Sequence, residues 1–182
     1  MDAPRSHAGF TLLELLIVIV IIGILATYVS LSIGNRAMDD RLESESQRVE
    51  QLVRLAEEES QVKGIALGIR FTATGYQFLA LNDKGQWADY SQAGGVLRTR
   101  HLAPPFYTEL HIEGRMVPPA QELQPGTDTQ AAKKPIEPQI LMLPGGETTA
   151  FEVDLKAPGY RPYVHVESDA LGRTRRERRW QQ

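Results

Sequence analysis

Cysteine is absent from the 182-residue sequence. Its absence excludes disulfides, thiolate metal sites, cysteine catalysis and a lipid-modified cysteine anchor, but it does not fix the compartment, because many exported domains fold without disulfides. A strong charge imbalance is also lacking, since the formal net charge is only -3. The whole chain therefore does not predict a polyanionic or polycationic partner. Its length allows one membrane-associated segment and one modest globular domain.

Charged residues are missing from a long segment near the N-terminus. None occurs from Leu15 to Gly34, and with its flanks this run is long enough to cross a bilayer, which needs roughly 20 apolar residues. An ordinary secretory signal is disfavoured, because Asp2 offsets Arg5 before the run and no convincing small-x-small cleavage site follows it. We therefore predict a membrane-spanning helix over residues 10–34.

Glu14 is a single carboxylate at the start of this apolar run. Toward the bilayer centre a carboxylate costs ~2.5 to 3.5 kcal/mol, so it normally indicates a partner, with contact to the headgroups as the simpler alternative. If the chain were cut after Gly9, Phe10 would carry a positive amine one helical turn away. Between two subunits packed with a small axial offset, that amine could meet Glu14 of the neighbour, and each charge would offset the other's desolvation. This pairing predicts a role for Glu14 in assembly.

The residues from Gly9 to Glu14 read GFTLLE and join a short polar leader to the apolar run. This arrangement resembles the type IV pilin-like signal of pilins and of type II secretion pseudopilins. The resemblance implies that a prepilin peptidase removes residues 1–9 by cleaving between Gly9 and Phe10, that it methylates the new amine of Phe10, and that Glu14 guides the subunit into a helical filament. Many major subunits carry a proline late in the apolar run. Residues 28–32 contain none, which removes the usual reason for local unwinding.

After Gly34 the pattern becomes amphipathic and predicts a second helical segment over residues 35–64. It should end at Lys63, because Gly64 suits a left-handed helix cap. The charges from Glu57 to Glu59 are interpreted as a solvated face. The apolar residues that share one face are Met38, Leu42, Val49, Leu52, Val53 and Ala56.

From Ile65 onward, short apolar runs alternate with turn residues, which predicts antiparallel strands. A hairpin is expected around Thr74 and Gly75, a further strand over residues 107–113, and a second antiparallel group from residues 140–143, 150–155 and 163–166. Residues 117–138 are expected to form an exposed loop. We predict an α+β, pilin-like fold in which one long N-terminal helix packs on antiparallel sheet. The expected divisions are a globular domain over residues 65–172 and a basic C-terminal tail over residues 173–182.

The order of these elements resembles the H-type minor pseudopilins of type II secretion systems. The resemblance is carried by the helix end LAEEESQVKG, the strand pair ALGIRF and GYQFLAL, the late PGGETTAFEV and the residues from Asp169 to Gly172. It implies a low-copy subunit near the tip of the pseudopilus, grouped with the I-, J- and K-type minor pseudopilins and the major pseudopilin, that supports export of folded proteins across the outer membrane. It also implies a single-pass protein of the bacterial inner membrane with its globular domain in the periplasm.

Residues suited to catalysis or metal binding form no recognisable site. The four histidines lack metal-ligand spacing, and no phosphate-binding loop, nucleophile elbow or convergent acid pair occurs. We therefore predict no metal, no cofactor and no enzymatic activity. The histidines are His7, His101, His111 and His165.

The basic tail is the strongest remaining signal, since five arginines beside Trp180 could grip phosphates and stack on bases. The simpler interpretation is a solvated terminus, or one that docks on an acidic neighbour. The alternative function is a type IV pilus minor pilin that binds DNA through these arginines, and a third is a plain single-span membrane protein that is never cleaved. The arginines are Arg173, Arg175, Arg176, Arg178 and Arg179.

Overall fold

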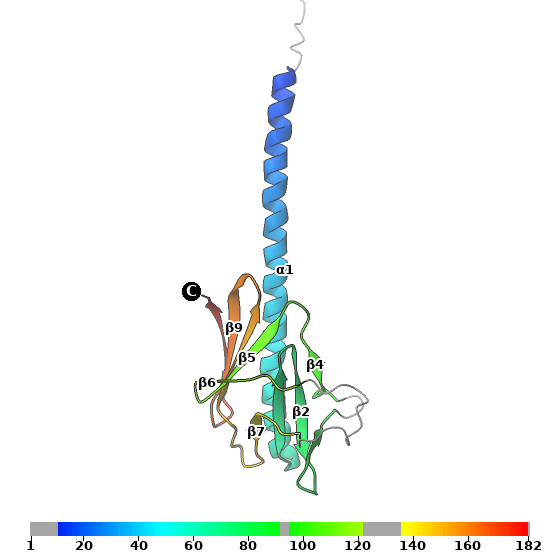
Figure 1. Cartoon of the computed structure of the whole chain (residues 1–182), viewed down its shortest axis with the longest axis vertical. Coiled ribbons are helices and arrows are strands. Elements are labelled where there is room, and N and C mark those ends of the chain that lie inside the picture. Colours follow the sequence, from blue (N-terminus) through cyan, green and yellow to red (C-terminus); the bar gives the residue numbers. More distant parts are fainter. Residues whose placement is uncertain (1–10, 92–94, 122–135, 182) are drawn as a thin grey trace, which may run out of the picture. The chain divides into compact units, whose positions relative to one another are not determined.

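The structure is a computed structural model that describes residues 11–91, 95–121 and 136–181, and within residues 28–35 it describes the backbone but not the side chains. The predicted leader, Phe10 and most of the predicted loop 117–138 lie outside the described residues. The described part contains one helix and ten strands (Figure 1), which confirms the α+β class. Their bounds are α1 Leu12–Lys63, β1 Leu67–Thr72, β2 Gly75–Leu81, β3 Trp87–Asp89, β4 Arg100–His101, β5 Tyr107–Ile112, β6 Arg115–Val117, β7 Ile140–Met142, β8 Phe151–Ala157, β9 Tyr160–Ser168 and β10 Thr174–Trp180.

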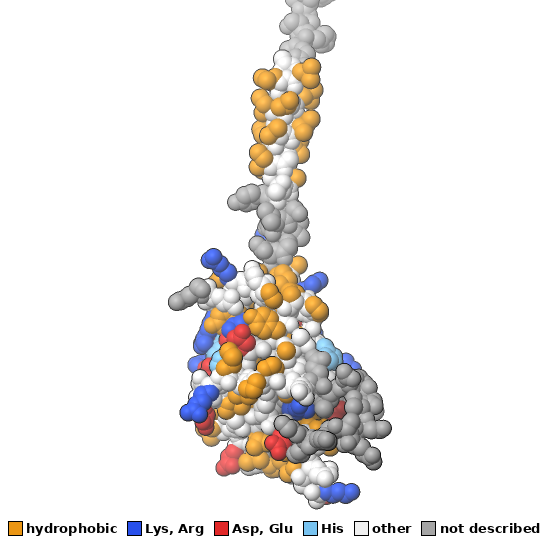
Figure 2. All heavy atoms as spheres, viewed as in Figure 1, with side chains coloured by type: hydrophobic (Ala, Val, Ile, Leu, Met, Phe, Trp, Pro, Cys, Tyr) orange, Lys and Arg blue, Asp and Glu red, His pale blue; other side chains and the backbone are white. Residues whose placement is uncertain are grey.

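The chain divides into two compact units after Arg41, seven residues beyond the predicted boundary at Gly34. In the first unit, every side chain from residue 11 to residue 27 is exposed. The large apolar side chains of this stretch range from 44% exposed at Val18 to 87% at Leu12. Figure 2 shows hydrophobic side chains along the visible face of this part of the helix. Among the described residues, no helix combines the length and the apolar character that a membrane span requires.

In the second unit, α1 buries the face that its amphipathic pattern predicts. Leu42, Val49, Leu52, Val53 and Ala56 are each at most 5% exposed, whereas the sixth predicted residue of this face belongs to the first unit and is half-buried. The predicted end of the helix is also confirmed. The residue after Lys63 is a glycine with φ of 67°, a conformation that only glycine adopts at little cost.

The first sheet has the strand order β3-β2-β1-β7, with β4 also paired to β2. The predicted hairpin forms β1 and β2, and Thr72 pairs directly with Gly75 across a two-residue turn. Gly75 therefore begins β2 rather than lying in the turn. A Cβ atom at this position would lie 2.2 Å from the carbonyl oxygen of Arg100, so glycine is required here for the close approach of β4.

The grouping of β7 with the later strands was predicted wrongly. Residues 140–142 pair with residues 67–69 of β1 and complete the first sheet. Ile140 and Met142 are at most 1% exposed and lie directly opposite Ile69 and Leu67. Pairing with β1 buries both apolar side chains in the core. This gain decides the partner of β7, although β8 is much closer along the chain.

The second sheet has the order β10-β9-β8-β5-β6, and all its strand pairs are antiparallel. It meets the first sheet where the hydroxyl of Thr108 donates a hydrogen bond of 2.8 Å to the carbonyl oxygen of Thr72. Phe71 of β1 and Phe151 of β8 also contact each other, with ring centroids 6.3 Å apart. The core of this unit therefore includes side chains from both sheets and from α1.

The sequence predicted that residues 173–182 form a basic tail separate from the globular domain. This prediction was wrong. Residues 174–180 form β10, which pairs with β9 from Thr174 opposite Ser168 to Trp180 opposite Pro162. The strand pairs with β9 along its whole length, and several of its arginines also form ion pairs with carboxylates on neighbouring elements. Arg175, for example, lies opposite Glu167 and forms an ion pair with it at 2.9 Å.

Candidate functional site

The predicted assembly residue Glu14 lies in the first turn of α1. Its backbone N–H donates to the hydroxyl of Thr11 at 3.2 Å and to the carbonyl oxygen of Thr11 at 3.1 Å. Thr11 is thus the N-cap of the helix and Glu14 is its third residue. The side chain of Glu14 is exposed, and a carboxylate in the first turn interacts favourably with the helix dipole.

This cap is a feature that the sequence interpretation missed, although a signal for it exists. The residues from Thr11 to Glu14 read TLLE, and Ser or Thr followed three residues later by Glu is the spacing of a capping box. The motif therefore combines two properties in four residues: an N-cap for a long apolar helix and an exposed carboxylate in its first turn. The predicted cleavage and methylation residues, Gly9 and Phe10, lie outside the described residues.

The arginines of residues 173–179 are engaged with carboxylates of the same chain. Arg176 forms ion pairs with Glu43 at 2.5 Å and Glu50 at 3.1 Å, both on α1. The other ion pairs are Arg173 with Asp169 at 2.7 Å, Arg175 with Glu167 at 2.9 Å and Glu177 at 3.8 Å, and Arg179 with Glu177 at 3.3 Å. Arg178 lies over the ring of Trp180, 5.6 Å from its centroid.

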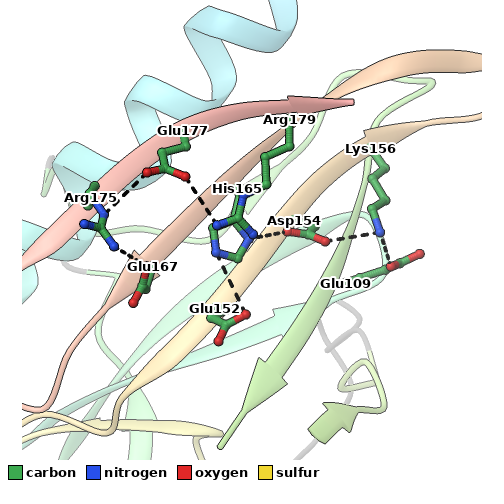
Figure 3. A network of polar contacts seen from close by, with 9 residues as sticks. All are labelled: Glu109, Glu152, Asp154, Lys156, His165, Glu167, Arg175, Glu177 and Arg179. Atoms are coloured by element: carbon green, nitrogen blue, oxygen red, sulfur yellow. Dashed lines mark hydrogen bonds and ion pairs between the residues drawn. The ribbon is translucent and has the colours of Figure 1, made fainter. Parts of the chain in front are cut away.

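Strand geometry also divides these arginines between two faces, because successive side chains point to opposite sides of a sheet. Arg176 points toward α1, whereas Arg175 and Arg179 lie on the opposite face with Glu177 (Figure 3). The arginines that were predicted to bind a nucleic acid together are therefore divided between two faces, and carboxylates pair with Arg173, Arg175, Arg176 and Arg179. This arrangement does not support the DNA-binding alternative.

A network of polar side chains covers the face of the second sheet that carries Arg175 (Figure 3). Its centre is His165, which is 5% exposed and whose Nδ1 lies 2.7 Å from Asp154. Lys156 bridges Asp154 at 3.2 Å and Glu109 at 2.5 Å. These contacts link the three neighbouring strands β5, β8 and β9. The network therefore has a structural role in holding the strands of this sheet together. In the part of the chain that the structure describes, no group of histidines and carboxylates could hold a metal ion.

Glu57 is a second carboxylate whose position the sequence interpretation missed. It was interpreted as part of a solvated face, but it is only 7% exposed and accepts a hydrogen bond of 3.2 Å from the hydroxyl of Ser168. Burial raises the pKa of Glu57 to about 7, although the Ser168 hydrogen bond and the charge of Arg54 act in the opposite direction. Its neighbour Glu58 is exposed, as predicted.

Comparison with known proteins assigns these features to a family. Residues 4–30 match the prokaryotic N-terminal methylation motif. Type II secretion system protein H of Aeromonas hydrophila is 30% identical over 175 residues, which cover 94% of this chain and 94% of that protein. The chain belongs to the type II secretion system protein H family. Protein H of Pseudomonas aeruginosa is also 30% identical, over 163 residues that cover 85% of this chain and 86% of that protein.

Solved structures agree with this protein H assignment at the level of the fold. The crystal structure of the minor pseudopilin EpsH from the type II secretion system of Vibrio cholerae superimposes with a TM-score of 0.59 at 19% identity, covering 75% of this chain and 93% of that one. The solution structure of E. coli GspH gives a TM-score of 0.55 at 13% identity, covering 77% and 89%. The predicted pilin-like fold, with an N-terminal helix packed on antiparallel sheet, is therefore confirmed.

Proposed function

We propose that this chain is a minor pseudopilin of a type II secretion pseudopilus that supports the export of folded proteins across the outer membrane. The observation that carries the proposal is the 30% identity to a protein H that extends over 94% of both chains. We place the subunit near the filament tip, in contact with the I-, J- and K-type minor pseudopilins and the major pseudopilin. Its role is structural rather than enzymatic.

The N-terminal segment provides processing and anchoring in this proposal. A prepilin peptidase cleaves between Gly9 and Phe10 and methylates the amine of Phe10, consistent with the methylation motif over residues 4–30. Residues 10–34 anchor the protein in the inner membrane as a single span, and the globular domain lies in the periplasm. The exposed apolar side chains from Leu12 to Leu25 support this arrangement, because lipid or neighbouring helices would cover a surface that is unfavourable in water.

Glu14 directs assembly by pairing with the Phe10 amine of a neighbouring subunit. It lies in the first turn of α1, four residues along the sequence from the predicted new terminus at Phe10. Because its side chain is exposed, it is available to another subunit. In an apolar filament core each charge would offset the desolvation of the other.

The test replaces Glu14 with Gln, which removes the charge and keeps the size of the side chain. In the host bacterium we expect the variant to be cleaved and methylated, so its intact mass should begin at methylated Phe10. Incorporation into sheared pseudopili and export of folded cargo should both fall about tenfold, since the lost pairing corresponds to roughly 1.4 kcal/mol or more.

The matched control is Glu58→Gln, which removes an exposed carboxylate from the same helix and should leave both readouts unchanged. Equal incorporation of the Glu14→Gln variant and the wild type would refute the pairing. An intact mass that still contains residues 1–9 in the wild type would refute processing. Normal secretion by a host that lacks this chain would refute the secretion role.

A further inference from the structure

The carboxylate of Glu57 is buried without an ion pair. Glu57 lies on α1 and is 7% exposed, and among the described residues its one polar contact is the hydroxyl of Ser168 at 3.2 Å. Arg54 lies one turn earlier on α1, but its guanidinium donates to Glu50 and to the carbonyl oxygen of Thr174, each at 2.8 Å. A buried carboxyl group in such surroundings favours the protonated form.

The turn between β9 and β10, residues 169–173, lies against this carboxylate. A Cβ atom added to Gly172 would lie 3.0 Å from Oε2 of Glu57. Ser168 before the turn and Thr174 after it both accept or donate hydrogen bonds to side chains of α1. Movement of the turn away from α1 would therefore let water reach the carboxylate.

The same turn is held together by hydrogen bonds of its own. The side chain of Asp169 accepts from the backbone N–H groups of Leu171 and Arg173 at 2.9 and 3.0 Å. Because these bonds do not involve α1, the turn can leave the helix as one piece. The carbonyl oxygen of Ala170 also accepts a hydrogen bond of 3.1 Å from the N–H of Thr148, outside the turn. This bond would break when the turn moves.

We propose that Glu57 and the β9–β10 turn form a pH-sensitive switch, in which ionisation of the carboxyl group releases the turn from α1. In the closed form the protonated group is buried under the turn, and in the open form the carboxylate is surrounded by water. The charged groups that act on Glu57 in the closed form are Arg54, which favours ionisation, and Asp169, which opposes it. The switch does not depend on the proposed role in secretion.

The direction of the pH dependence follows from burial. Burial raises the pKa of Glu57 from 4.5 to about 7 in the closed form, whereas water restores the ordinary value in the open form. The closed form therefore binds the proton more tightly, and this advantage is lost as the pH rises through about 7. Between pH 6 and pH 8 the ratio of open to closed molecules should rise about tenfold.

Amide hydrogen exchange, measured by NMR on the full chain in micelles, tests the switch. The reporter is the N–H of Thr148, because its hydrogen bond to Ala170 breaks when the turn opens. After correction for the intrinsic effect of pH on exchange, the protection of this N–H should fall about tenfold between pH 6 and pH 8. The reference is the N–H of Leu102, which donates to the carbonyl oxygen of Thr74 in the β1–β2 turn and should keep its protection.

Two variants assign the effect to the carboxyl group. Glu57→Gln keeps the size of the side chain and removes its titration, so Thr148 should be equally protected at both pH values. Glu58→Gln is the matched control, because it removes the exposed carboxylate that lies next in sequence and should preserve the tenfold fall.

The comparison of the two pH values in the wild type decides the proposal even without a variant. Constant protection of Thr148 would overturn the switch. Equal losses at Thr148 and Leu102 would also overturn it, because the whole globular unit would then be opening. A fall at Thr148 that persists in Glu57→Gln would show that another group controls the turn, and the switch would again be refuted.

Discussion

The hydroxyl of Ser168, the last residue of β9, donates a hydrogen bond of 3.2 Å to the carboxylate of Glu57 on α1. Both side chains are buried, at 1% and 7% exposure. The contact connects the helix to the start of the β9–β10 turn. Because burial raises the pKa of Glu57 to about 7, the charge of this carboxylate changes close to neutral pH.

The stability of the protein should therefore depend on pH through Glu57. Its ordinary pKa is 4.5 and its folded pKa is about 7, so between these values the folded state binds more protons than the unfolded state. The free energy of unfolding therefore falls as pH rises through this window. Above the window, the contribution of the protonated carboxyl group to stability is lost completely. We expect Glu57→Gln to stabilise the full chain at pH 8 by about 1 to 2 kcal/mol and to have little effect at pH 4.5.

Denaturant unfolding in detergent micelles at both pH values would measure this difference. Glu58→Gln is the control, because that carboxylate lies next in sequence and is exposed. The explanation fails if Glu57→Gln changes stability equally at the two pH values, since the effect would then come from packing rather than from titration.

Gly172 should be intolerant of a side chain because it lies directly over the same carboxylate. Its φ is 74°, and a Cβ atom there would lie 3.0 Å from Oε2 of Glu57. Gly172→Ala should lower the free energy of unfolding by about 1 kcal/mol because of the strained backbone conformation. The close approach of the added Cβ atom to Glu57 should lower it further. Gly85→Ala supplies the control, since Gly85 has a φ of 71° with no heavy atom within 4 Å of the added Cβ. Equal losses in the two variants, measured by denaturant unfolding, would show that Glu57 does not limit the space.

Arg176 should contribute more to stability than the other arginines of β10. Its side chain is 23% exposed and pairs with two carboxylates of α1, whereas that of Arg175 is 67% exposed. We expect Arg176→Gln to reduce the free energy of unfolding by about 1 to 2 kcal/mol and Arg175→Gln by less than about 0.5 kcal/mol. A double-mutant cycle with Glu50→Gln would isolate the pair, and a coupling energy near zero would contradict this assignment.

The elements that the sequence predicted correctly are those with local signals. The end of α1 follows from Gly64, its buried face from the spacing of apolar residues, and the first hairpin from two apolar runs with a turn between them. The sheet to which β7 belongs depends on pairing with β1, about 70 residues earlier in the chain. No local pattern contains that information.

The candidate site shows the same division between local and distant information. The GFTLLE motif indicated Glu14 as an assembly residue from sequence alone, and that role stays a prediction. In contrast, strand β10 was not predicted, because a run of arginines has the composition of a solvated terminus and the sequence does not show which residues pair with it. Those partners lie on α1 and β9, and the carboxylates that compensate Arg176 are Glu43 and Glu50, more than 120 residues away. Glu57 was misassigned because burial by the β9–β10 turn leaves no trace in the sequence around it.

The N-cap at Thr11 allows the helical and the electrostatic roles of the TLLE segment to be separated. The hydroxyl of Thr11 accepts a hydrogen bond from the N–H of Glu14. Thr11→Val keeps the shape of the side chain and removes this acceptor, which should cost about 1 kcal/mol. Exchange of the Glu14 amide hydrogen, measured by NMR on the full chain in micelles, should then become about fivefold faster. Thr11→Ser should restore the slower rate.

The same variants distinguish the cap from the assembly charge. Thr11→Val leaves the Glu14 carboxylate in place, so incorporation into sheared pseudopili should fall much less than in Glu14→Gln. If Thr11→Val impairs incorporation as strongly as Glu14→Gln does, the ordered first turn of α1, rather than the charge of Glu14, is what the filament requires. That result would show that the motif acts in assembly by starting the helix and not by pairing two charges.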